Sequence, residues 1–290
     1  MRYVQLRAFH NVAICGGFSR AAEALHLTQP AISDQVRKLE EEYDLILFNR
    51  RKKQVSLTNA GERLLEITRR LFEVEKQAHD MLSESRSLRS GLLRVIADSA
   101  HHALPVIGRF RERYPGIELS IHTGNSEDVL SQLLNYEAEV GVLGEVPQGE
   151  NFEVIRLSSS PLIAFAAADH PLAQQGSVTL KALARQMLVL REPGSKTRSS
   201  IEVAAAERSI KLKASIEAEG REAVREIVAI SGGVGIVSAA EFGRDPRLVP
   251  LRITDCEVVL DEALICLAER AGSKLISAFL DSARDVIGRD

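Results

Sequence analysis

The most constraining feature of the sequence is a proline-free stretch from Thr58 to about Leu88 with a regular apolar pattern. Its apolar residues follow one another in alternating steps of four and three: Ala60, Leu64, Ile67, Leu71, Val74, Ala78 and Met81. Such a heptad repeat predicts a helix of about 30 residues with one apolar seam. Because the short segment before it is too small to cover this seam, we expect the helix to pair with a second copy of itself.

The residues before this helix predict three short helices separated by tight turns. Apolar residues at helical spacing stop at Gly16-Gly17, which ends the first helix. Ser19 offers an N-cap oxygen for a second helix over residues 20–25, and Thr28 offers one for a third. Pro30 falls in the first turn of the third helix, where its missing N–H costs nothing.

The segment from Phe18 to Arg37 has the layout of a helix-turn-helix, whose second helix enters the major groove of DNA. Two strand-like runs follow, at residues 45–48 and 54–57, and predict a hairpin, or wing, with a cationic tip. Gln and Arg side chains can bond to base edges, while hydroxyls and the cations of the wing can bond to phosphates. The candidate DNA-binding residues are Ser19, Arg20, Thr28, Gln29, Pro30, Ser33, Asp34, Arg37, Arg50, Arg51, Lys52 and Lys53.

The charge distribution also points to DNA. Residues 1–94 hold 16 Lys+Arg and 12 Asp+Glu, a net charge of +4, which leaves −7 for residues 95–290. A basic first third on an acidic body indicates a polyanionic partner for the first third alone. The alternatives are a three-helix bundle without a ligand and a charged loop that is merely solvated.

Beyond a hinge at Ser87, Ser90 and Gly91 the pattern alternates between strands and helices. The expected strands are residues 92–97, 117–123, 140–143, 162–167, 188–190, 214–217 and 236–237. The expected helices are residues 103–114, 127–136, 200–207 and 221–230, with a closing helix over 273–287. This alternation predicts parallel, doubly wound sheets in two α/β lobes.

The string AFHNVAICGGFSRAAEALHLTQPAISDQVRKLEEEYDLILFNR, followed by Leu57-Thr58-Asn59-Ala60-Gly61, resembles the LysR-type transcriptional regulators. The order of the later parts is similar too, so the resemblance covers essentially the whole chain. It implies an α+β multi-domain fold in three parts. These are a winged helix-turn-helix over 1–58, a dimerising linker helix and hinge over 59–90, and an α/β bilobed effector-binding domain over 91–290. One departure is Asp34, where many members have a basic or small residue facing DNA.

In this family the effector-binding domain resembles type 2 periplasmic binding proteins, with the effector between the lobes. We expect lobe I at about 91–160 and 267–290, and lobe II at about 161–266. Four places at predicted strand ends or helix starts suit an anion there, because they join polar side chains to free N–H groups. They are Asp98-Ser99, Gly124-Asn125-Ser126, Pro193 to Arg198 and Gly220-Arg221-Glu222. Ordinary helix caps have the same appearance.

The strings LEITRRLFEVE, GNSEDVL, LREPGSKTR, REAVREIVA and EFGRDPRL are similar to the LysR-type regulators linked to 2-aminoethylphosphonate catabolism. That effector is a zwitterion, so its site needs donors for the phosphonate and a carboxylate for the ammonium group. The candidate donors are Ser99, Asn125, Ser126, Ser195, Thr197 and Arg221, and the candidate carboxylates are Asp98 and Glu222. The alternative is a LysR-type regulator that responds to a different small anion.

Other candidate sites are weaker. His101, His102 and His122 could bind a metal, but adjacent histidines in a turn point apart, so we expect no metal site. Cys256 and Cys266 have no cationic neighbour in sequence that would make them peroxide-reactive. The run Gly232-Gly233-Val234-Gly235 follows a helix, so a turn is favoured over a dinucleotide loop. We find no catalytic constellation and expect neither an enzyme nor a cofactor.

The sequence therefore predicts a transcription regulator that binds an interrupted palindrome in double-stranded DNA and is controlled by a small anionic effector. We expect a homodimer through the linker helix and, beyond it, a homotetramer. The longest apolar run, Leu162 to Ala168, has seven residues, and no apolar h-region follows Met1, so the expected location is the cytoplasm. A cytosolic enzyme or solute-binding protein and a non-specific architectural DNA protein are the competing classes.

Overall fold

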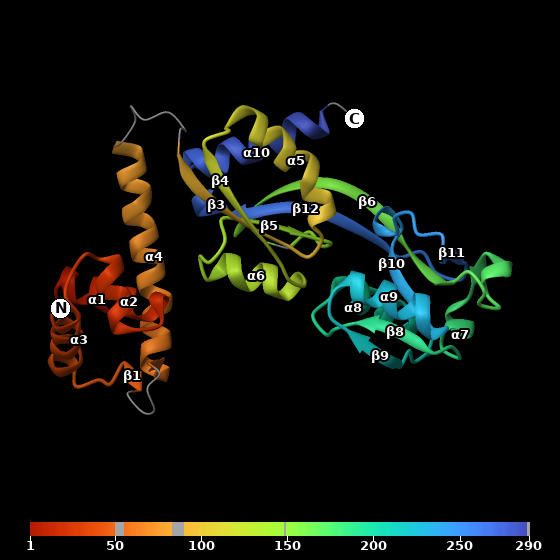
Figure 1. The fold of residues 1–290 in the computed structure, drawn as a ribbon, viewed down its shortest axis with the longest axis horizontal. Coiled ribbons are helices and arrows are strands. Elements are labelled where there is room, and N and C mark those ends of the chain that lie inside the picture. The colour runs from red at the N-terminus through yellow and green to blue at the C-terminus, as the bar shows by residue number, and fades with distance from the viewer. Residues whose placement is uncertain (50–54, 83–89, 148, 289–290) are drawn as a thin grey trace. The chain divides into compact units, whose positions relative to one another are not determined.

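A computed structural model describes residues 1–49, 55–82, 90–147 and 149–288 of the chain. The chain divides into two compact units, Met1–Glu84 and Ser85–Asp290 (Figure 1). The predicted wing cations Arg50 to Lys53 and the hinge residue Ser87 lie outside the described residues.

The first unit contains three short helices, a two-stranded hairpin and one long helix. They are α1 (Tyr3–Cys15), α2 (Phe18–Ala24), α3 (Gln29–Tyr43), β1 (Phe48–Asn49), β2 (Ser56–Leu57) and α4 (Asn59–Leu82). Gly16 ends α1 with a φ of 66°, a left-handed conformation that glycine adopts without steric cost. The prediction that Ser19 caps the second helix is wrong, because α2 begins at Phe18 and its N-cap is Gly17.

A small aromatic core holds this unit together. Phe9 and Phe48 are fully buried, and their ring centroids lie 5.3 Å apart. Phe18, at the start of α2, packs edge-on against Phe48 at 5.6 Å. Ile32 and Val36 complete the core from α3, as their helical spacing predicts. The core therefore fixes α2 and α3 against the hairpin and leaves their polar faces outside.

The predicted seam on α4 divides into two parts. Its first residues, Ala60 and Leu64, are half-buried against the core of the unit. Further along, Ile67, Leu71 and Val74 are 64%, 42% and 61% exposed. A row of large apolar side chains left open on a helix of 24 residues is typical of a surface that pairs with another chain.

The second unit is an α/β structure around one long mixed sheet. Its strands are β3 (Gly91–Ala97), β4 (Ile117–Thr123), β5 (Val140–Leu143), β6 (Phe152–Ala167), β7 (Ser177–Val178), β8 (Leu188–Arg191), β9 (Ala214–Ala218), β10 (Val234–Ser238), β11 (Leu248–Ile253) and β12 (Val259–Leu267). Its helices are α5 (Ala100–Arg113), α6 (Ser126–Leu134), α7 (Leu180–Leu183), α8 (Lys196–Ala206), α9 (Arg221–Ser231) and α10 (Lys274–Ile287). Three 3-10 turns lie at Ala173–Gln175, Ala239–Glu241 and Ala268–Arg270.

The strand order along the sheet is β4-β3-β5-β12-β6-β10-β8-β9. Each end of the sheet is a parallel triplet, as the alternating pattern predicts. The middle differs from the prediction, because β12 and β6 run antiparallel to each other and to the strands beside them.

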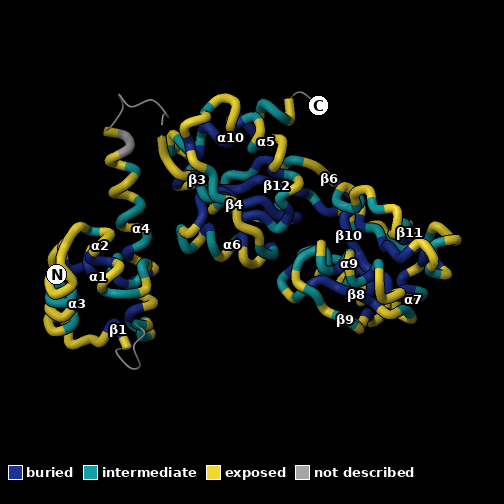
Figure 2. Tube along the Cα trace, viewed as in Figure 1, coloured by how far each residue is buried: buried dark blue, intermediate teal, exposed yellow. Residues whose placement is uncertain are grey.

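Two cores divide this unit into lobes (Figure 2). Lobe I has its buried apolar side chains in residues 93–155 and 263–283, and lobe II has them in residues 162–260. Lobe I includes the parallel strands β3 to β5, and lobe II includes β8 to β10. The strands β6 and β12 pass through both lobes and pair from Phe152–Leu267 to Pro161–Val259. Residues at the ends of the parallel strands of lobe I therefore face those of lobe II where β6 and β12 join the two lobes.

Candidate functional site

The polar face of α3 offers the first candidate site. Thr28 precedes the helix in extended backbone, and Gln29 and Pro30 in the first turn are exposed. Ser33 lies further along the helix and is partly exposed. Since Ile32, Val36 and Leu39 are buried behind them, these polar side chains point away from the unit. A helix held in this way can enter a major groove with its N-terminal residues foremost.

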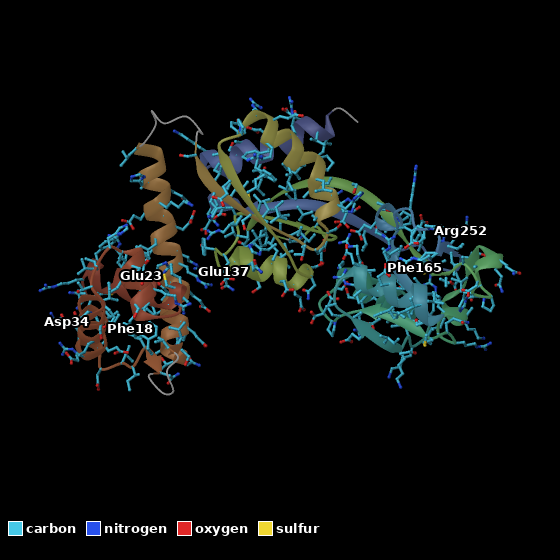
Figure 3. All side chains as sticks on the ribbon, viewed as in Figure 1. Phe18, Glu23, Asp34, Glu137, Phe165 and Arg252 are labelled. Carbon is cyan, nitrogen blue, oxygen red and sulfur yellow. The ribbon has the colours of Figure 1, made fainter. Side chains whose placement is uncertain are left out.

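Asp34 changes the charge of this face. Its carboxylate lies 2.6 Å from the Arg37 guanidinium and 2.7 Å from the Lys38 ammonium. These two cations hold the pKa of Asp34 below its usual range through hydrogen bonds. Arg37 also pairs with Glu41 at 2.8 Å. The cations of α3 are thus bound to carboxylates on their own helix, and Figure 3 shows Asp34 at the surface of the unit.

The beginning of α2 adds a second polar surface. Ser19 and Arg20 are exposed, and the Arg20 guanidinium donates a hydrogen bond of 2.6 Å to the carbonyl of Gly16. A groove of about 630 Å³ lies beside them, between residues 16–20 and the β2 side of the hairpin at Val55 and Ser56. The described DNA-binding candidates therefore lie on α2, on α3 and in the turn before α3.

The second candidate site is a cleft of about 1130 Å³ in the second unit, lined by residues of both lobes. Of the predicted effector-binding residues, Asp98, Asn125, Arg221 and Glu222 line it. Beside it, a cavity of about 10 Å³ is lined by Ser126, Ser195 and Thr197, together with Asp98 and Arg221. The remaining candidate, Ser99, is buried and accepts a hydrogen bond from Arg221. All eight candidates thus lie in or beside one cleft, although the sequence spreads them over 125 residues.

Arg221 joins the two lobes at the base of this cleft. It is the first residue of α9 in lobe II, and its guanidinium donates to the Ser99 hydroxyl and to the Asp98 carbonyl in lobe I. The same guanidinium pairs with Glu241 at 2.5 Å. A second contact between the lobes runs from the Asn125 side-chain amide to the carbonyl of Pro193 at 3.4 Å.

Buried charged residues surround this junction, and of these the sequence analysis named only His102, as a weak metal candidate. Arg191 ends β8, is 8% exposed and pairs with Glu192 at 2.7 Å. His102, Glu241 and Glu262 lie around Arg221 and Asp98. The signal in the sequence is a charged residue within or directly after an apolar strand, as in LVLR and VVLDEALICL. A charged group at such a position is buried, and buried charges are functional or paired.

Burial and neighbouring charges move the pKa values of these groups in opposite directions. Burial, together with the charge of Asp98, raises the pKa of Glu262 to about 8. Burial also raises the pKa of Asp98, although Gly144 and Ser126 donate hydrogen bonds to its carboxylate. For Glu241, burial works against ionisation, but the interaction with the His102 ring and the charge of Arg221 outweigh it and hold the pKa low. The cleft base thus combines carboxyl groups that favour different protonation states.

The cleft as a whole is more acidic than an anion site requires. Seven of its lining residues are carboxylates and three are arginines: Arg191, Arg221 and Arg225. Each of these arginines has a carboxylate partner, Glu192, Glu241 and Asp245 respectively. The arrangement suits a ligand that carries a positive group as well as a negative one.

The weaker candidates separate in the structure. His122 contacts Ser120 on β4, and only His101 and His102 lie near one another, with ring centroids 5.5 Å apart. Cys256 belongs to the core of lobe II and Cys266 to that of lobe I. Burial raises the pKa of both thiols, that of Cys266 to about 11, which disfavours the reactive thiolate. Gly232 ends α9 in a left-handed conformation, as a helix-terminating turn requires.

Within the described parts of the chain, every helix is too short or too polar to cross a membrane.

Comparison with known proteins identifies the families of the two units. Residues 3–62 match the bacterial regulatory helix-turn-helix proteins of the lysR family, and residues 86–288 match the LysR substrate binding domain. A RuBisCO operon transcriptional regulator of Allochromatium vinosum is 32% identical over 276 residues, which cover 94% of this chain and 91% of that protein.

Two solved structures are also similar. A full-length OxyR variant from Pseudomonas aeruginosa has a TM-score of 0.80 and 22% identity, covering 99% of this chain and 97% of that one. The regulatory domain of CcmR from Synechocystis, in complex with 2-PG, has a TM-score of 0.61 and 26% identity and covers 68% of this chain and 97% of that one. The predicted fold class and the absence of an enzyme function are thereby confirmed. The chain belongs to the LysR family and is a DNA-binding transcription regulator with a domain for a small-molecule effector.

Proposed function

We propose that this regulator binds an interrupted palindrome as a homodimer and is controlled by a small molecule with a phosphate or phosphonate group between its two lobes. The observation that carries the proposal is Arg221, which extends from lobe II to Ser99 and the Asp98 carbonyl of lobe I. A ligand anion that engages Arg221 alters a bond between the lobes. Effector binding then changes how the two lobes pack. The effector can shift the equilibrium between two lobe arrangements only if it binds one of them more tightly than the other.

Hydroxyl and N–H donors beside Arg221 support an anion. Ser195 stands at the N-cap of α8, is 3% exposed and makes no side-chain hydrogen bond to its helix. Thr197 lines the same small cavity, as does Ser126, whose hydroxyl donates to the Asp98 carboxylate. An uncapped helix of 11 residues offers free N–H groups and a positive dipole end, which favour phosphate-like oxygens. By contrast, Asn125 caps α6 with its side-chain oxygen, and its amide nitrogen donates to the Pro193 carbonyl of the other lobe.

The identity of the anion separates into two hypotheses. The seven carboxylates of the cleft favour a zwitterion such as 2-aminoethylphosphonate, with its ammonium group near Asp98 or Glu222. The similarity to a domain that holds 2-PG, and to a regulator named for the RuBisCO operon, favours a phosphorylated acid without an amine. The relatives named here give no support to phosphonate catabolism, so the zwitterion rests on the charge of the cleft.

A ligand titration distinguishes the two. We would titrate the full chain with 2-aminoethylphosphonate and with 2-phosphoglycolate, and record the thermal midpoint and the binding isotherm. At 100 times the dissociation constant a ligand adds about 2.7 kcal/mol of stability, which shifts the midpoint by several degrees. Inorganic phosphate and β-alanine serve as controls for the separate charged groups.

Variants locate the site. Ser195→Ala and Thr197→Val should weaken binding of the active ligand by about tenfold each, because each loses one hydrogen bond to a charged group. Ser199→Ala is the matched control, since its hydroxyl is exposed and bonds only to its own helix at the Lys196 carbonyl. If both cleft variants bind the ligand with unchanged affinity, the proposed site is wrong. If neither 2-aminoethylphosphonate, 2-phosphoglycolate nor inorganic phosphate binds, the proposed class of ligand is wrong.

The DNA side of the proposal rests on α3 and the open seam of α4. Two copies joined along Ile67, Leu71 and Val74 carry two recognition helices, and their separation fixes the spacing of the half-sites. A footprint of the full chain on its own upstream region should show two protected half-sites related by a twofold axis. Since such a regulator acts where the chromosome is, we place it in the cytoplasm. If a random-sequence duplex displaces the protein from its site as readily as the upstream region does, the protein is instead an architectural DNA-binding protein.

A further inference from the structure

Three side chains with metal-binding atoms meet where the two lobes join. His102 lies on α5, Glu241 ends the 3-10 turn after β10, and Glu262 lies on β12. The His102 Nε2 atom is 3.3 Å from a Glu241 oxygen and 3.7 Å from a Glu262 oxygen. Their donor atoms all lie within 4.8 Å of one another. The side chains are 6%, 7% and 2% exposed, so water does not solvate them freely.

Two atoms of this cluster, one on His102 and one on Glu262, are not satisfied by hydrogen bonds. His102 Nε2 and Glu262 Oε2 are buried and have no hydrogen-bond partner among the described residues. On the opposite side of the ring, His102 Nδ1 lies 3.3 Å from the Ser158 hydroxyl. A metal-ligating histidine is oriented in this way, with one nitrogen held by a neighbouring polar group and the other free for the ion. A buried polar atom without a partner costs free energy, so it points to a missing ligand.

We propose that His102, Glu241 and Glu262 form a binding site for one divalent transition-metal ion, of which Zn²⁺ is the best match, that bridges the two lobes. Zinc binds imidazole nitrogen and carboxylate oxygen at about 2.0–2.2 Å with tetrahedral geometry, which places neighbouring ligand atoms about 3.4 Å apart. The separations of 3.3 and 3.7 Å fit this value.

The charges around the cluster also fit a divalent cation. When ionised, Asp98, Glu241 and Glu262 carry three negative charges in one buried region, and Arg221 supplies one positive charge. The remaining charge of −2 is the one that a divalent ion neutralises. Arg221 bonds to Oε1 of Glu241, and ligating carboxylates commonly keep such an outer hydrogen bond.

The position of the site gives it a structural consequence that is independent of the effector. His102 belongs to lobe I and Glu241 to lobe II, while Glu262 lies at the bulge where β12 passes from one to the other. An ion held by all three fixes the lobes in the arrangement seen here. The proposal therefore does not depend on whether the effector is a phosphate or a phosphonate.

The test measures metal directly in the full chain. Protein stripped with a chelator is titrated with Zn²⁺, then desalted, and its zinc content per chain is measured by mass spectrometry. Co²⁺ in place of zinc gives a visible absorption spectrum whose intensity reports tetrahedral coordination. We expect one ion per chain. At a free zinc concentration of 100 times the dissociation constant, the unfolding equilibrium constant should fall about 100-fold, because zinc binds the folded state.

Variants assign the ion to the site. Glu262→Gln and His102→Gln keep the side-chain size and should lower zinc affinity by more than about 100-fold, beyond the effect of losing an outer hydrogen bond. Glu257→Gln and His122→Gln, both exposed and outside the cluster, should bind zinc as the parent chain does. The proposal is overturned if the parent chain binds no zinc after desalting, or if it binds zinc equally well without Glu262. Circular dichroism of each stripped variant checks that it is folded.

Discussion

Replacing Asp34 with Asn should increase the affinity of the regulator for DNA of any sequence. Asp34 holds Arg37 and Lys38 at 2.6 and 2.7 Å on the polar face of α3 (Figure 3). Its loss leaves Lys38 free for a phosphate, while Arg37 keeps a second partner in Glu41. We therefore expect one new phosphate contact, made by Lys38. A second contact, made by Arg37, is the upper limit. Since these pairs are exposed to solvent, we expect the fold of the unit to be unaffected.

The magnitude follows from counterion release. Each additional phosphate contact steepens the plot of log K against log salt by about 0.9. At 0.1 M monovalent salt this corresponds to about 8-fold tighter binding for one contact and about 60-fold for two. Fluorescence anisotropy with a random-sequence duplex, at several salt concentrations, measures the slope without base-specific contacts.

The control for this experiment is Glu23→Gln on α2, which removes the same charge from an exposed position of the same unit. No ion pair of Glu23 is found among the described residues, so its loss changes the net charge without freeing a cation. If both variants show the same salt slope, Asp34 does not restrain the cations of α3 and the reasoning is refuted.

Three further changes test other parts of the structure. Leu71→Glu puts a charge on the open seam of α4 and should convert dimers to monomers in analytical ultracentrifugation. Lys76→Glu, which lies off the seam, should leave the dimer intact, and a dimeric Leu71→Glu protein would place the interface elsewhere. Arg270→Met should cost about 1–3 kcal/mol in urea unfolding followed by circular dichroism, because the 1% exposed Arg270 donates to the buried Glu139 carboxylate and to the Ala138 carbonyl. Arg94 stays bound to Glu139 at 2.6 Å, so the buried carboxylate keeps one cation; an unchanged stability would contradict this. Gly61→Ala should lower the thermal midpoint of the first unit, since a Cβ there would lie 2.2 Å from the Leu47 carbonyl oxygen, and an unchanged midpoint would show that this turn can shift freely.

The sequence was most informative where one strong local signal set the structure. The end of α1 at Gly16, the place of Pro30 in the first turn of α3 and the strand 117–123 follow from glycine, proline and apolar spacing, and these predictions are confirmed. Thr28 stands at the N-cap of α3 as predicted, but its side chain makes no capping hydrogen bond. The N-cap of α2 was wrong because Gly17 allows the helix to begin earlier than Ser19. Local chemistry leaves such boundaries uncertain by a residue or two.

The middle of the large sheet was not predictable in the same way. The middle of β6 contains three consecutive serines, Ser158 to Ser160, and β12 contains Asp261 and Glu262, so neither has the apolar pattern of a buried strand. These polar residues lie where the strands pass between the lobes, and Glu262 lines the small cavity beside the cleft. The same residues explain why the cleft base was only half found: Asp98 and Arg221 follow strand ends, whereas Glu262 lies inside a strand and is buried only by tertiary packing.

The strands β6 and β12 also have a consequence for the order of folding during translation. The core of lobe II comes from one continuous stretch, residues 162–260, and is complete once that stretch has left the ribosome. The core of lobe I needs β12 and α10, which are synthesised more than 100 residues after β5. Lobe I is therefore the first lobe to begin synthesis and the last to complete its core. Until β12 has been synthesised, the strands β3 to β5 lack the neighbour that pairs with β5.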